Sequence, residues 1–75
     1  MTSNKYMTQV AIDYLAEKII WKQGSDPEYP FFTIVAGDKA VIRLNDFPDE
    51  SLYTLIVNDV NLLDFDEWPE QWQRP

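Results

Sequence analysis

Cysteine and histidine are both absent from this sequence of 75 residues. Without cysteine, neither a disulfide framework nor a thiolate metal site can stabilise so short a chain. Without histidine, the commonest general base and the commonest metal ligand are missing. The only two glycines, Gly24 and Gly37, are too few for a glycine-rich phosphate loop. We therefore expect a protein that is not an enzyme, with no catalytic residue, no cofactor and no metal.

Basic residues are scarce in the second half of the chain. Residues 1–43 contain five acids and five bases, whereas residues 44–75 contain eight acids and a single base, Arg74. The whole net charge of −7 therefore belongs to residues 44–75. Such an excess repels nucleic acids and anionic membranes and attracts basic surfaces. The alternative is an acidic surface that only keeps the protein in solution.

Long hydrophobic runs are also missing. The longest nearly apolar run, residues 31–36, is far too short to cross a bilayer. Residues 1–10 contain no apolar core of a signal peptide. These features predict a soluble cytoplasmic protein, and the length predicts a single small domain over residues 1–75.

Residues 7–22 have the apolar spacing of an amphipathic helix. Ala11, Leu15 and Ile19 recur every four residues, and Gly24 follows as a stop signal. A second apolar stripe of Val10, Tyr14 and Trp21 needs a cover of its own, because an isolated surface helix buries only one stripe.

The remainder of the chain contains a 21-residue tandem repeat. Residues 31–50 and 52–71 each show an apolar run, a Gly/Asn/Asp turn, a second run and then an aromatic–proline–acid segment that should leave the sheet. The predicted fold class is α+β, with the N-terminal helix packed on one face of a four-stranded antiparallel sheet made of two β-hairpins.

Side-chain alternation predicts which residues of the hairpins face the helix. The inward set is Phe32, Ile34, Ile42, Leu44, Tyr53, Leu55, Leu63 and Phe65. This alternation requires an odd number of residues in each turn, whereas the dipeptides Gly37-Asp38 and Asn58-Asp59 suggest two-residue turns, and a bulge would reconcile the two. On the outer face the same register gathers four aliphatic residues: Val35, Val41, Ile56 and Leu62. They form either a contact surface, which could also join two copies into a homodimer, or a patch that the tail covers, or an artefact of a register shifted by one residue.

The tail, residues 66–75, is acidic and rich in tryptophan. The acids Asp64, Asp66, Glu67 and Glu70 surround Trp68 and precede Trp72. Trp68 occupies the repeat position of Phe47, which favours a structural role at the end of the sheet. Trp72 either covers the stripe of Val10, Tyr14 and Trp21 or is an exposed anchor for a partner. The carboxylates fit a solvated surface better than a Ca²⁺ site or a catalytic pair.

These features predict a small non-catalytic protein-binding module, such as an inhibitor, an immunity-type protein or a regulatory adaptor. Its acidic C-terminal half would bind a protein partner with a basic surface, through the tail residues and the outer aliphatic patch named above. The alternative is a nucleic-acid mimic, whose carboxylates imitate phosphates and occupy a DNA- or RNA-binding protein.

Overall fold

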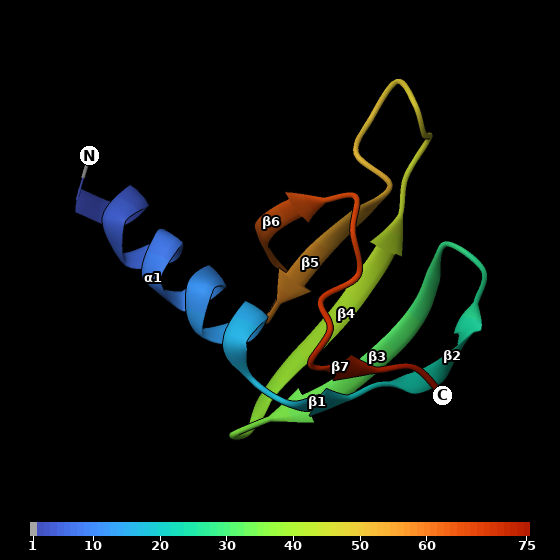
Figure 1. Cartoon of the computed structure of the whole chain (residues 1–75), viewed down its shortest axis with the longest axis horizontal. Helices are drawn as coiled ribbons and strands as arrows, with labels where there is room; N and C mark the ends of the chain where they lie inside the picture. Colours follow the sequence, from blue (N-terminus) through green and yellow to red (C-terminus); the bar gives the residue numbers. More distant parts are fainter. Residues whose placement is uncertain (1) are drawn as a thin grey trace.

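The computed structural model describes the backbone of residues 2–75 and the side chains of residues 9–75. One helix is followed by a five-stranded antiparallel sheet and a short two-stranded ribbon (Figure 1). The elements, in chain order, are α1 (Thr2–Ala16), β1 (Ile19–Ile20), β2 (Lys22–Asp26), β3 (Tyr29–Val35), β4 (Asp38–Leu44), β5 (Tyr53–Val57), β6 (Val60–Phe65) and β7 (Trp72–Gln73). The α+β class is therefore confirmed.

The predicted helix over residues 7–22 is wrong at both ends. It begins at Thr2 and ends at Ala16, and the chain then enters β1 and β2. From Ile19 to Lys22, buried and exposed side chains alternate with the period of two that a strand requires. Ile19 satisfies the four-residue helical spacing as well, so the apolar pattern alone did not separate the two states.

The sheet has five strands, not four, because residues 22–26 form β2 at one edge. The order is β2-β3-β4-β5-β6, with each strand hydrogen-bonded to its neighbour in sequence. β1 instead pairs in parallel with β7, which brings the C-terminal residues back beside the segment that follows the helix. The backbone N–H of Trp21 donates to the carbonyl of Gln73 at 2.9 Å, which extends this pairing.

The predicted register is wrong in the first hairpin. Val35 pairs with Asp38, so the turn is the two-residue Ala36-Gly37, with φ of 51° and 86°. Every side chain of β3 is therefore on the opposite face from the predicted one: Phe32 and Ile34 face outward, and Thr33 is buried. Leu44, predicted inward, is exposed, whereas Ile42 is buried as predicted.

The second hairpin keeps the predicted inward face because it contains the bulge. Asn58 and Asp59, with φ of 49° and 68°, form a two-residue turn between Val57 and Val60. The register then shifts between Leu55 and Ile56, and the extra residue is Leu62. Beyond the bulge the inward residues are those predicted: Tyr53, Leu55, Leu63 and Phe65 pack in or against the core.

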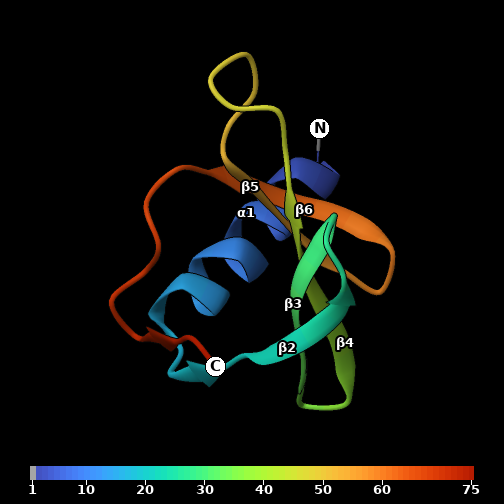
Figure 2. The same ribbon diagram turned by 90° about the vertical axis from the view of Figure 1, so that its right-hand side faces the viewer.

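The core lies on the inner face of the sheet. The C-terminal part of α1, the β1–β7 ribbon and the tail cover this face together (Figure 2). On the helix the buried residues are Ala11 and Tyr14, whereas Ile12 is half exposed, so each of the two predicted stripes contributes one buried residue to the contact. The buried core consists of Tyr14, Ile19, Trp21, Ala40, Ile42, Leu55 and Trp72.

Candidate functional site

Trp72 belongs to the core rather than to a binding surface. Its side chain is 3% exposed, and its ring centroid lies 5.1 Å from that of Trp21. The indole N–H donates to the backbone carbonyl of Tyr14 at 2.8 Å, which joins the end of the chain to the helix. Of the two predicted roles, the cover over Tyr14 and Trp21 is the one the structure contains, and the exposed anchor is wrong.

Trp68 is the centre of an aromatic cluster. Its ring lies 5.2 Å from Phe31, 5.5 Å from Tyr53 and 5.4 Å from Trp72, and its indole N–H donates to the Trp72 carbonyl at 2.9 Å. The guanidinium of Arg74 lies 4.8 Å from the same ring in a cation–π contact. This is a structural role of the kind predicted.

Phe47, at the repeat position of Trp68, has a different environment. Its side chain is 59% exposed, in the segment between β4 and β5. Both closing segments leave the sheet as predicted, but one of them folds onto the core and the other does not. The 21-residue repeat is therefore not confirmed as a structural unit beyond the two hairpins.

The acids of the tail divide into two groups. Asp64 accepts a hydrogen bond from the Thr54 hydroxyl at 2.7 Å, and Asp66 accepts one from the Leu52 backbone N–H at 2.8 Å. Glu67 and Glu70 are exposed. Because both tryptophans pack inside, the tail offers these carboxylates without the aromatic anchor that the sequence suggested.

Only half of the predicted outer aliphatic patch is on the outer face. Val41 and Ile56 are there, as cross-strand neighbours on β4 and β5. Val35 and Leu62 pack against the core instead, because the first hairpin has a two-residue turn and Leu62 is the bulge residue. The tail lies on the inner face, so the patch is not covered by it.

Two other apolar residues take their place on the outer face. Phe32 is paired with Val41 and is 36% exposed, and Ile34, in the next row along β3, is 61% exposed. Sequence reasoning placed both in the core. The signal that could have corrected this is the alternation of Phe31, Thr33 and Val35, which is inward if the turn has two residues.

The outer face is hollowed along its strands. One open hollow of about 460 Å³ has Val41 and Ile56 in its lining, together with Tyr29, Lys39, Asp59 and Asn61. A second, of about 300 Å³, shares Asn61 with the first and is lined also by Arg43, Asn45, Glu50, Ser51, Thr54 and Asp64. A third, of about 400 Å³, shares Arg43, Asn45 and Glu50 with the second and adds Pro27, Glu28, Leu44 and Asp46. These three hollows are neighbours that share lining residues, and we call them together the outer groove.

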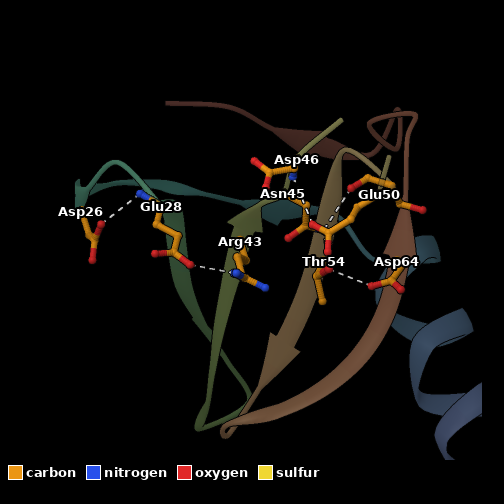
Figure 3. A network of polar contacts seen from close by, with 9 residues as sticks. Asp26, Glu28, Arg43, Asn45, Asp46, Glu50, Thr54 and Asp64 are labelled. Carbon is orange, nitrogen blue, oxygen red and sulfur yellow. Dashed lines mark hydrogen bonds and ion pairs between the residues drawn. The ribbon is translucent and has the colours of Figure 1, made fainter. Parts of the chain in front are cut away.

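A polar network supports the wall of the outer groove (Figure 3). Glu28 accepts a hydrogen bond from Arg43 Nε at 2.9 Å, and this contact raises the pKa of the arginine. Asn45 Nδ2 donates to Thr54 Oγ1 at 2.7 Å, and Thr54 in turn donates to Asp64. The Thr54 hydroxyl therefore accepts one hydrogen bond and donates another, and the second one holds Asp64 in place at the rim.

The charges of the outer groove are mostly negative. Its linings contain five acids (Glu28, Asp46, Glu50, Asp59 and Asp64) and two bases (Lys39 and Arg43), a net charge of −3. Since Arg43 is already paired with Glu28, Lys39 is the base of the linings that forms no ion pair among the described side chains. An apolar floor with acids around it is suited to binding a basic protein surface rather than an anion.

The described side chains, residues 9–75, provide no group of three or more acidic residues placed to hold a metal ion. Within the same part of the molecule, no helix is long and apolar enough to cross a membrane. Comparison of the chain with protein-family models, curated proteins and solved structures finds no match.

Proposed function

We propose that this protein is a small non-catalytic protein-binding module that binds a basic partner through its outer groove. The observation that carries the proposal is the pair Val41 and Ile56, open to solvent on the outer face and bordered by carboxylates. Protein interfaces commonly combine an apolar centre with a polar rim, and the centre supplies most of the affinity.

The distribution of charge supports a basic partner. Of the five acids in the groove, all except Glu28 belong to residues 44–75, the part of the chain that carries the whole charge excess. Carboxylates at a rim increase the rate of encounter with a positively charged protein and disfavour acidic competitors. The tail acids Glu67 and Glu70 extend this field without forming the contact surface.

Charge-neutral variants of equal size test the proposal. Glu50→Gln with Asp64→Asn removes two negative charges from the groove and keeps an oxygen acceptor for each hydrogen bond. Asp13→Asn with Glu17→Gln removes two charges from the exposed surface around the end of α1 and serves as the matched control. A third pair, Glu67→Gln with Glu70→Gln, separates the tail from the groove.

The immobilised protein first captures partners from an extract of the cells that produce it naturally. The association rate of each captured partner is then measured at two salt concentrations. The groove pair should slow association several-fold and weaken its salt dependence, because steering by charge is lost. The helix pair should change neither. Equal behaviour of the groove and helix pairs would contradict the proposal, and partners that duplex DNA displaces would support the nucleic-acid mimic instead.

A further inference from the structure

The outer groove follows the direction of the strands. Val41 and Ile56 are directly paired, and the next outward row toward the β4–β5 segment is Arg43 and Thr54, with Asp64 paired to Thr54. Beyond the end of β4, the groove continues along Asn45, Asp46 and Glu50. Successive outward rows are two residues apart, which is about 6.6–6.8 Å along a strand. The groove therefore presents an apolar row, then a row with a carboxylate, then further carboxylates.

An extended chain matches this repeat. Its side chains on one face also recur every two residues, so positions i, i+2 and i+4 can meet three successive rows. A helix places its same-face side chains about 5–6 Å apart and drifts around its axis, which does not match the rows. Sheets packed face to face are nearly aligned, so a strand of a partner can lie along this groove.

The edges of the sheet are less suitable for such a strand. The ladder of β6 is interrupted by the bulge at Leu62, and that of β2 by a register shift between Gln23 and Asp26. Irregular edges disfavour the addition of a further strand by backbone hydrogen bonding. The occupant is thus expected on the face, with its own backbone groups paired inside the partner.

We propose that the outer groove receives an extended segment of the partner, one strand of a hairpin, that carries an apolar side chain and a Lys or Arg on the same face. The apolar side chain packs over Val41 and Ile56. The basic side chain two residues along meets Asp64, and a second one, four residues along, meets Glu50 and Asp46. This assignment rests on the proposed function and specifies the chemistry of its partner.

A second copy of the chain is a poorer occupant than a basic segment. Each copy has a net charge of −7, and a symmetric pairing presents the same acidic face twice. Among the described side chains, Lys39 is the one base of the groove linings that is outside an ion pair and could offset this repulsion. Charge complementarity therefore favours a basic partner over self-association.

Two cyclic hairpin peptides of identical composition test the assignment. In the ordered peptide, one strand displays Leu, Arg and Arg on one face at successive alternate positions, with Thr between them. In the permuted peptide, the Leu is exchanged with a neighbouring Thr, so that it lies on the opposite face from the two Arg. Binding to the full chain is measured by isothermal titration calorimetry at low and at physiological salt.

The ordered peptide should bind at least tenfold more tightly than the permuted one. Ile56→Thr keeps a β-branched residue on β5 but removes apolar floor, and should abolish most of that preference. Ile20→Thr is the matched control, because Ile20 is 66% exposed on β1, away from the outer groove, and should leave the preference unchanged. The Glu50→Gln and Asp64→Asn pair should weaken both peptides.

Each other outcome has a definite meaning. Equal affinity of the two peptides, with both weakened by the groove pair, overturns the ordered segment but leaves the proposed function standing. If both peptides bind and the Glu50→Gln and Asp64→Asn pair changes neither affinity, the ordered segment and the proposed function are overturned together. Failure of both peptides to bind, or a dimer in sedimentation that Ile56→Thr converts to monomer, also overturns the segment.

Discussion

Replacing Trp72 with alanine should remove a large part of the protein's stability, although this residue is the fourth from the end of the sequence. A buried tryptophan truncated to alanine costs about 3–5 kcal/mol in general. The structure places Trp72 at the upper end of that range, because its ring contacts Trp21, Phe65 and Trp68 and its N–H bonds the Tyr14 carbonyl. A 75-residue domain has a total stability of about 4–11 kcal/mol at the usual values per residue.

Two further variants separate the contributions. Trp72→Phe keeps an aromatic ring and loses the indole N–H, so we expect a cost of about 1–2 kcal/mol. The Tyr14 carbonyl still accepts the Glu17 N–H at 3.2 Å, which limits the penalty. Phe47→Ala, in a residue 59% exposed, should cost no more than about 0.5 kcal/mol.

Thermal denaturation followed by far-UV circular dichroism, a signal that comes mainly from the backbone, measures all three variants. A shift of about 4–8 °C in Tm per kcal/mol is expected for a domain of this size. If Trp72→Ala and Phe47→Ala differ by less than about 1 kcal/mol, which is within the usual range of surface substitutions, the role assigned to Trp72 is wrong.

Gly24→Ala should destabilise the β2–β3 hairpin by about 1–3 kcal/mol, because the added Cβ would collide with the Tyr29 carbonyl oxygen. Ser25→Ala, at the exposed neighbouring position, should be nearly neutral in the same thermal scan. The phenol of Tyr14 should affect stability at alkaline pH. Burial raises the pKa of this phenol most, and the charges of Asp38 and Glu17 raise it further. The folded chain then keeps a proton that the unfolded chain loses at about pH 10, so the free energy of unfolding should be level below that pH and fall above it. Tyr14→Phe should flatten this fall in urea titrations between neutral and alkaline pH, and an unchanged slope would contradict the assignment.

The sequence predicted the two hairpins well because their turn residues and apolar runs are local signals. Asn58 and Asp59 tolerate positive φ, and the runs that precede the two turns are rich in β-branched and aromatic residues. The prediction of which side chains of the first hairpin face the core is wrong only because the number of turn residues is even. The predicted inward set required an odd number of turn residues, and the two-residue turn Ala36-Gly37 places every side chain of β3 on the other face. Ala36 at φ 51° is an uncommon choice, and nothing in its residue type announces it.

The predicted C-terminal boundary of the helix is wrong because the contacts that decide it come from residues far away in the sequence. Residues 19–22 carry a pattern that fits a fourth helical turn or a short strand, and the choice depends on what covers Trp21. In the structure the cover comes from Trp68 and Trp72, about fifty residues later. The parallel pairing of β1 with β7 adds hydrogen bonds that a longer helix would forgo. Such a contact leaves no local trace in residues 7–22.

The same long-range closure also explains where the candidate site is. The helix, the β1–β7 ribbon and all three tryptophans lie on the inner face of the sheet, so these core aromatics do not cover the outer face, where Phe32 is exposed and Tyr29 lines the groove. The outer face consequently keeps Val41 and Ile56 open, while the neighbouring ends of β5, β6 and the β4–β5 segment supply the acids. In a protein this small, a core built on one face of a sheet leaves the opposite face uncovered, and the charge of residues 44–75 is the reason that we propose a basic partner for it.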